Sequence, residues 1–238
     1  MKSNIHVSKT VDETIHQLAD KIYQASLNTE TTYFHMAISG GSTPLKLFKY
    51  MGEAYASRMP WHKFKLFWVD ERCVPPDHKE SNYGNASQNL LSHVNIPKNQ
   101  VYRIKGENKP EDESKRYDNV LGENLPFLEG YPRLNFIILG MGSDGHTASI
   151  FPDQMHLLES EKFCDVAEHP ETGQKRITLT GRVINNAAYI AFLVTGENKA
   201  HTLSQVMNEN NRHLPATLIQ PGHGVVEWYL DDQAASKL

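Results

Sequence analysis

The sequence predicts an α/β protein in which residues 1–238 form a single domain, with a mostly parallel sheet covered by helices on both faces. Two observations favour this fold. Runs of β-branched and aromatic residues alternate with amphipathic helical runs along the whole chain. No internal repeat, low-complexity tract or Gly/Ser-rich linker divides the 238 residues, which are enough to bury a substantial core.

The first elements follow from local signals. Thr10-Val11-Asp12-Glu13 has the pattern of a helix-capping box, and apolar residues then recur at helical spacing as far as Tyr23. The segment 32–38 is β-branched and aromatic and is followed by glycines, which is typical of a buried strand. In the rest of this half, a strand is expected at 64–69 and helices at 44–55, 85–91 and 111–121.

The second half continues the alternation. The segment 134–139 is apolar and stops at Gly140, so it predicts another buried strand. Further strands are expected at 176–179, 189–195 and 224–230, and helices at 198–207 and 232–238. In open sheets of this kind ligands bind beyond the carboxyl ends of the strands, so we expect the chemistry in the loops that follow strands.

The overall charge is slightly negative. The chain has 24 Lys and Arg residues against 28 Asp and Glu, which gives a formal net charge of −4. A general binder of nucleic-acid backbones needs the opposite sign, so no nucleic-acid partner is expected. With 39% apolar and 22% charged residues, the composition also excludes a disordered chain.

Compartment signals are few. Cys73 and Cys164 lie far apart and outside any Cys-x-x-Cys pair, which predicts two reduced thiols. The N-terminus shows no apolar signal-peptide core, and no run reaches the roughly 18 apolar residues that span a bilayer. These features predict a cytoplasmic protein without a membrane partner.

The first loop of interest is Ser-Gly-Gly-Ser-Thr-Pro at 39–44, between a predicted strand and a predicted helix. Its glycines allow close approach to a ligand, Thr43 is a good N-cap and Pro44 a good first helical residue. Free N–H groups and hydroxyls at a helix start suit a phosphate. The alternative is an ordinary tight turn with a cap. The loop is not a Walker A motif, because no Gly-Lys-Ser/Thr follows.

The second loop, Asp70-Glu71-Arg72, places three charged residues directly after an apolar strand. Arg72 could grip a phosphate or carboxylate with its planar guanidinium, and Asp70 could bind sugar hydroxyls or orient a base. The alternative is a solvated strand end with an Asp–Arg pair.

The third loop, Gly-Met-Gly-Ser-Asp-Gly-His-Thr at 140–147, contains G-x-G-x-x-G after a strand. A dinucleotide site is not expected, because the motif lies mid-chain and Pro152 follows too soon for a full helix. A serine-hydrolase elbow also fails, since Met141 stands where the first glycine is needed. The Asp144-Gly145-His146 segment instead suits a general base with a carboxylate to orient it. Neither His-Glu-x-x-His nor a cysteine pair supports a metal site.

The fourth loop, Thr-Gly-Glu-Asn-Lys-Ala at 195–200, ends a predicted strand and starts a helix. Lys199 falls in the first turn, where the helix dipole disfavours a cation unless an anionic ligand offsets that cost. The alternative is a lysine that faces solvent.

Together these loops resemble the 6-phosphogluconolactonase family, within the larger group that includes glucosamine-6-phosphate deaminase. The longest matching block is Gly-Met-Gly-Ser-Asp-Gly-His-Thr-Ala-Ser-Ile-Phe-Pro at 140–152. The other matching segments are 39–44, 70–75, 176–180, 196–200, 214–216 and 228–231. The resemblance therefore covers nearly the whole chain in the expected order.

The resemblance implies a Rossmann-like fold of the deaminase/lactonase type. It also implies hydrolysis of 6-phospho-D-glucono-1,5-lactone to 6-phospho-D-gluconate in the oxidative pentose phosphate pathway. The partner would be this small phosphorylated lactone, with no metal and no organic cofactor, and a monomer is expected rather than a stable oligomer. His146 would be the general base, with Asp144 and Asp70 as polar supports. The residues implied to hold the phosphate or nearby oxygens are Gly41, Ser42, Thr43, Arg72 and Lys199.

Two other functions remain open. In the deaminase branch the His loop carries a Glu before a Pro, whereas here the tail Thr-Ala-Ser-Ile-Phe-Pro ends without one. That departure favours the lactonase. A non-catalytic sugar-phosphate sensor on the same fold is the third hypothesis, although such a sensor would have no need for the intact Asp144-Gly145-His146 loop.

Overall fold

The computed structural model describes residues 4–238, and its centre is a seven-stranded sheet in which every recorded strand pairing is parallel. The strand order is β1-β12-β11-β8-β2-β3-β5. The bounds are β1 (Asn4–Ser8), β2 (Phe34–Ile38), β3 (Phe64–Trp68), β5 (Val101–Tyr102), β8 (Phe136–Leu139), β11 (Tyr189–Val194) and β12 (Val225–Asp231). The predicted parallel α/β fold is confirmed.

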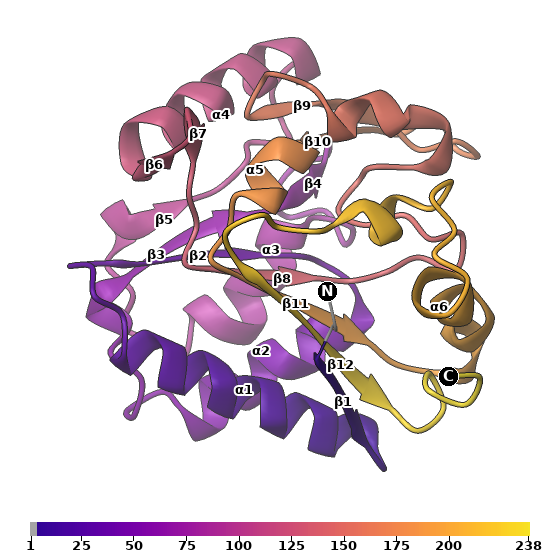
Figure 1. Cartoon of the computed structure of the whole chain (residues 1–238). Coiled ribbons are helices and arrows are strands. Elements are labelled where there is room, and N and C mark those ends of the chain that lie inside the picture. The colour runs from indigo at the N-terminus through magenta and orange to yellow at the C-terminus, as the bar shows by residue number, and fades with distance from the viewer. Residues whose placement is uncertain (1–3) are drawn as a thin grey trace.

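Helices lie on both sides of this sheet. Figure 1 shows α1 (Val11–Leu27) and α2 (Ser42–Ala54) together below it, and α4 (Pro110–Asn124) and α5 (Gly181–Asn185) above it. The capping box at Thr10 is confirmed, since its hydroxyl accepts a hydrogen bond from the Glu13 N–H. Because both faces are covered, β2 and β8 are buried at every position. No helix within residues 4–238 is long and apolar enough to cross a membrane.

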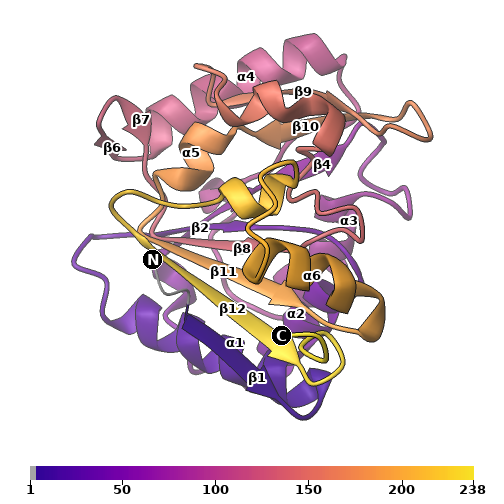
Figure 2. The ribbon, with the colours of Figure 1, turned by 45° about the vertical axis from the view of Figure 1, so that its right-hand side comes forward.

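A second, three-stranded antiparallel sheet lies on the α4 side, in the order β4-β10-β9 (Figure 2). Its strands are β4 (Asp70–Arg72), β9 (Cys164–Glu168) and β10 (Lys175–Leu179). The segment 70–72 was expected to be a loop, and this expectation is wrong. Three charged residues carry no strand signal of their own, but β10 pairs with all three, with Arg176 opposite Arg72.

Several other boundaries differ from expectation. The strand β1 was not predicted, and 232–238 forms turns rather than a helix. The Ala234 N–H donates to the carboxylate of Asp231, so a side-chain acceptor, and not a helical carbonyl, satisfies it. The expected helix at 85–91 begins earlier, as α3 (Asn82–Ala86), and continues as a π-helical turn through Leu91. A short β6–β7 hairpin (Phe127–Leu128, Tyr131–Pro132) was also missed.

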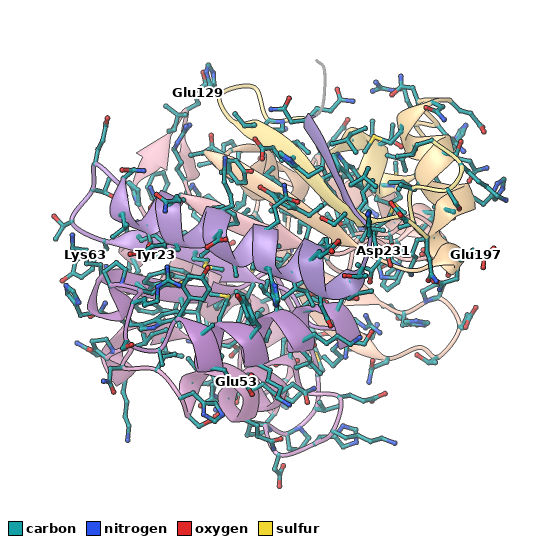
Figure 3. All side chains as sticks on the ribbon, turned by 90° about the horizontal axis from the view of Figure 1, so that it is seen from below. Tyr23, Glu53, Lys63, Glu129, Glu197 and Asp231 are labelled. Carbon is teal, nitrogen blue, oxygen red and sulfur yellow. The ribbon has the colours of Figure 1, made fainter. Side chains whose placement is uncertain are left out.

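The sheet has a topological switch point between β2 and β8. After β2 the chain crosses to β3 on one side, and it later returns to β8 on the other side of β2. The loops after these two strands therefore diverge, and the space between such loops, called the crevice below, is where ligands bind in open α/β sheets. Figure 3 shows Asp231, at the end of β12, and Glu197, after β11, together at one end of the molecule, opposite Lys63, which precedes β3.

Candidate active site

The third loop holds a His–Asp pair. His146 Nδ1 lies 2.6 Å from Asp144 Oδ1, and the His146 backbone N–H donates to the same oxygen at 3.2 Å. Burial alone would raise the pKa of Asp144, but the hydrogen bond and charge of His146 hold that pKa below its ordinary value. The His146 side chain is 27% exposed, and within residues 4–238 no hydrogen bond is made to Nε2. The pair can therefore present Nε2 to a ligand.

Glycines make this pair possible. A Cβ on Gly142 would lie 2.2 Å from both Asp144 Oδ1 and His146 Nδ1, so any side chain there would separate the pair. Gly145 adopts φ +80°, a left-handed conformation that strains other residues. The glycine spacing that resembles a dinucleotide motif serves here to fold a tight loop around His146.

The loop is fastened from several sides. The Thr147 hydroxyl donates to the Gly140 carbonyl at 2.8 Å. From α6 (Ala200–Met207), the Thr202 hydroxyl donates to the Ser143 carbonyl at 2.6 Å. The Phe151 ring lies 4.7 Å from the His146 ring. The N–H groups of Gly142 and Gly145 donate to carbonyls within the loop, so they are not spare donors.

Asp70 lies behind the crevice in a buried polar bridge. It is 4% exposed, and its Oδ2 accepts a hydrogen bond of 2.7 Å from the Ser149 hydroxyl. Its backbone carbonyl accepts from the Asn82 side chain at 2.9 Å. A Cβ on Gly40 would overlap the Asn82 amide, so the first loop packs closely on this bridge. Asp70 thus joins the first three loops.

Two arginines meet beside the bridge. Arg176, on β10, is 8% exposed, and its best contact is a 3.5 Å hydrogen bond to Ser149 Oγ. Burial lowers the pKa of Arg176, and the positive charge of Arg72 lowers it further. Among residues 4–238 no group accepts from the buried Nε of either guanidinium. Two neighbouring cations with unused donors suit an anionic ligand.

Lys199 closes the crevice on the far side, in a short 3₁₀ turn (Glu197–Lys199) directly before α6. Burial lowers the pKa of Lys199, whereas the negative charge of Asp144 raises it, so the lysine lies within electrostatic range of the His–Asp pair. The turn is held by Gly196, whose N–H donates to Asp231 Oδ1 at 2.9 Å.

The predicted phosphate loop needs a correction in detail. The helix α2 begins at Ser42 with Gly41 at the N-cap, so Thr43 is not the N-cap. The Thr43 hydroxyl instead shares a 2.9 Å hydrogen bond with Thr195 Oγ1, which ties the first loop to the fourth. Gly41 takes φ +114°, a conformation that side-chain-bearing residues rarely adopt.

All the predicted site residues lie shortly after the neighbouring strands β11, β8, β2 and β3, in loops, in the first turn of a helix or, for Asp70 and Arg72, in the short strand β4. Sequence reasoning did not select Arg176, Ser149 or Asn82. For Arg176 a signal existed, since it is a charged residue at the start of an apolar strand, but nothing local shows that this strand faces Arg72. Ser149 lies inside the long block 140–152 without a feature that marks it.

A cavity of about 630 Å³ lies elsewhere, between α6, the 3₁₀ turn Pro215–Leu218 and the start of β12. Its walls include Val206, Ile219 and Trp228, and none of the described residues that line it is ionisable. It therefore lacks the groups that acid–base chemistry requires. Within residues 4–238, no three His, Cys, Asp or Glu side chains are grouped so that they could hold a metal ion.

The chain is similar to known proteins of one family. The family model described as glucosamine-6-phosphate isomerases/6-phosphogluconolactonase matches residues 9–228. A 6-phosphogluconolactonase from Haemophilus influenzae is 43% identical over 207 residues, which cover 86% of this chain and 87% of that protein. A crystal structure of a devB protein is 39% identical, with a TM-score of 0.93 and 99% of each chain covered. The 6-phosphogluconolactonase of Trypanosoma brucei is 26% identical, with a TM-score of 0.90 and 100% and 99% of the two chains covered.

The fold, with loops that diverge at its switch point, is that of a Rossmann-like α/β protein, a class that includes many enzymes. The chain belongs to the glucosamine-6-phosphate isomerase/6-phosphogluconolactonase family. The predicted family, and the prediction that the chain is an enzyme, are confirmed.

Proposed function

We propose that the protein hydrolyses 6-phospho-D-glucono-1,5-lactone to 6-phospho-D-gluconate, a step of the oxidative pentose phosphate pathway. The observation that carries this proposal is the 2.6 Å His146–Asp144 pair beside the switch point, with Lys199 within electrostatic range of Asp144. The Arg176 guanidinium lies 5.6 Å from the Phe151 ring, which packs on His146. The curated relatives named 6-phosphogluconolactonase support the same substrate.

In the proposed mechanism, Asp144 accepts a hydrogen bond from the Nδ1–H of His146, which leaves Nε2 free to act as the base. Nε2 removes a proton from water while the water oxygen attacks the lactone carbonyl carbon, and the carbonyl electron pair moves to oxygen. When the carbonyl re-forms, the bond to the ring oxygen breaks, and protonated His146 returns its proton to that oxygen. One water is consumed and one carboxylic acid is formed. General-base catalysis of this kind contributes about 10²–10⁴-fold.

The phosphate is proposed to bind at the other end of the crevice. Gly41, Ser42 and Thr43 at the start of α2 offer N–H groups and hydroxyls, and Lys199 adds a positive charge. Arg72 lies close to Arg176, and the unused guanidinium donors support both as ligands of the phosphate. Since the phosphate is remote from the reacting carbon, its binding energy can position the lactone against His146.

Asp70 is proposed to act indirectly. Its buried carboxylate holds Ser149, which contacts Arg176, so Asp70 supports the anion site rather than touching the substrate.

One observation favours the lactonase over the deaminase branch. The position before Pro152 is Phe151, a fully buried ring packed on His146. An apolar ring there cannot replace the carboxylate that the deaminase loop carries at that position. This supports water as the only partner of the base.

We also propose that the chain acts as a single-domain cytoplasmic monomer. The continuous parallel sheet supports one domain, and the free thiols of Cys73 and Cys164 support a reducing compartment.

The decisive experiment adds purified protein to freshly made 6-phosphogluconolactone and follows acid release against the spontaneous rate. Parallel incubation with glucosamine 6-phosphate tests for ammonia. Acid release above background that is lost in His146→Ala is the expected result. Ammonia release would indicate the deaminase instead, and neither product would indicate a sensor.

A further inference from the structure

Glu71 is a buried carboxylate that the mechanism above does not use. It is 1% exposed, and none of the ion pairs among residues 4–238 includes it. Its Oε1 accepts hydrogen bonds from the backbone N–H groups of Arg72 at 2.8 Å and Asn82 at 2.7 Å. Its Oε2 accepts from the Tyr83 N–H at 2.7 Å and the Ser81 hydroxyl at 3.2 Å. One carboxylate thus joins β4 to the segment 81–83.

These bonds fix Arg72 at both of its ends. The backbone of Arg72 is held directly, through its own N–H. Its guanidinium donates from an NH group to the Glu80 carbonyl at 2.9 Å, and Glu80 immediately precedes the segment 81–83 that Glu71 also holds. The direction of the guanidinium therefore depends on a loop that Glu71 closes.

The backbone around this loop is closely packed, so the loop has little room to move. A Cβ on Gly84 would lie 2.2 Å from the Pro76 carbonyl oxygen, and one on Gly106 would lie 2.3 Å from the Arg72 carbonyl oxygen. Because the loop packs backbone to backbone at both points, a change in the Glu71 hydrogen bonds shifts the loop as a unit.

Burying a carboxylate to close a loop costs free energy of folding. Burial raises the pKa of Glu71 to about 7, although the three backbone N–H groups aimed at it act in the opposite direction. Desolvation of a charge without a cation opposes folding, so stability alone does not explain its presence.

We propose that Glu71 is a positioning residue for the anion site: it sets the backbone and guanidinium of Arg72 for the substrate phosphate. This inference rests on the proposed function, in which Arg72 binds that phosphate.

The test compares Glu71→Gln with the matched control Glu113→Gln. Glu113 is also 1% exposed and also closes a loop, since it accepts from the Lys105 N–H at 2.6 Å next to Gly106, but it is paired with Arg116. A second control, Asp118→Asn, lies away from this loop, since Asp118 accepts from the Phe163 N–H at 2.6 Å and the Cys164 N–H at 3.2 Å. For Glu71→Gln we expect KM for 6-phosphogluconolactone to rise about tenfold with kcat within about twofold. The controls should leave both constants unchanged. An unchanged KM, or a loss confined to kcat, overturns the inference.

Two further measurements separate positioning from general damage. Hydrolysis of unphosphorylated glucono-1,5-lactone should be equal in Glu71→Gln and wild type, because that substrate has no phosphate for Arg72. In an Arg72→Ala background, Glu71→Gln should have no additional effect on KM, as expected for two residues that act as one unit. A tenfold additional effect, or an equal loss on both lactones, overturns the inference.

A calorimetric measurement of 6-phosphogluconate binding distinguishes failure of this inference from failure of the proposed function. Absence of turnover by the wild type refutes the proposed function, whereas wild-type-like 6-phosphogluconate binding by Glu71→Gln refutes the inference. Should Glu71→Gln fail to fold, Ser81→Ala removes one of the four donors, together with the hydroxyl that caps α3 at the Gly84 N–H, and should raise KM about threefold while hydrolysis of the unphosphorylated lactone stays unchanged. An unchanged KM in that variant overturns the inference as well.

Discussion

The His146 end and the arginine end of the crevice are built in opposite ways. At the His146 end the loop's polar groups bond within the protein, and a carboxylate matches the histidine. At the arginine end, Arg72 and Arg176 bring like charges together and leave buried N–H donors without acceptors.

This difference indicates which end is complete before a ligand arrives. A base must be held in place before the reaction, because its orientation contributes directly to the rate. An anion site gains affinity if its cations are close together and incompletely paired. The arriving phosphate offsets the repulsion between the cations and accepts hydrogen bonds from their unused donors. We expect substitutions at the first end to lower kcat and those at the second to raise KM.

The largest expected effect comes from removing the base. His146→Ala should lower kcat by about 10²–10⁴-fold, because water then attacks without proton removal, while KM changes by less than about threefold. Steady-state acid release measures both constants. Turnover at the wild-type rate would refute the assignment of His146.

The next largest effect on kcat is expected at Gly142, which lies against the His146–Asp144 pair. Gly142→Ala should lower kcat by about 10²-fold, since its Cβ would push apart two atoms that lie 2.6 Å from each other. The control, Gly140→Ala, lies in the same loop and meets nothing within 4 Å. Equal activities of the two variants would show that the His–Asp distance is unimportant.

A smaller effect, confined to KM, is expected at the arginine end. Arg176→Ala should raise KM by about 10–100-fold through loss of a charged hydrogen-bond donor, with kcat nearly unchanged. In thermal denaturation, its ligand-free Tm should not fall, because the substitution removes a like-charge contact. Stabilisation by added 6-phosphogluconate should be lost.

The control is Arg182→Ala, which removes a guanidinium that donates to the Glu159 carbonyl and the Tyr131 hydroxyl. A matching rise in KM for this control would contradict the prediction.

The smallest expected effect on activity comes from Glu227, on β12 next to the edge strand β1 and outside both ends of the crevice. Burial alone would raise the pKa of Glu227, but hydrogen bonds from Tyr189, His6 and Tyr229 hold it at about 2. A lowered native pKa stabilises the fold above the ordinary carboxyl pKa, and this contribution is lost as pH falls towards 2.

Glu227→Gln should therefore lower Tm by about 3–8 °C at pH 6, and this difference should shrink steadily below pH 4. The value of kcat should stay unchanged. A Tm difference independent of pH would mean that the charge of Glu227 does not stabilise the fold.

The sequence predicted the parts of the site that depend on local signals. Glycines and a capping pattern mark where strands end, and the charged or hydroxyl residues that follow them lie at one edge because the strands are parallel. Local signals thus placed His146, Arg72 and Lys199 in neighbouring segments at this edge, although Arg72 lies in β4 and not in the expected loop.

The parts of the site that the sequence did not predict depend on pairings between segments that are far apart along the chain. Arg176 enters the site because β10 pairs antiparallel with β4 and sets it opposite Arg72. Thr43 loses its expected role as N-cap because Thr195, from another loop, shares a hydrogen bond with its hydroxyl. Such partners are fixed by register, which one strand's composition does not contain.

The pairing of β1 with β12 has a consequence for how the molecule assembles. Within residues 4–238, the strand β1 is the first element and its only strand partner is β12, and the Asn4–Glu227 contact spans 223 positions. Contacts of such separation form late, because loop closure must be completed first. The same strand β12 ends at Asp231, which holds Gly196 and so the turn that carries Lys199. We therefore expect docking of the first strand and formation of the crevice to occur together late in folding, and recovery of activity during refolding measures when both are complete.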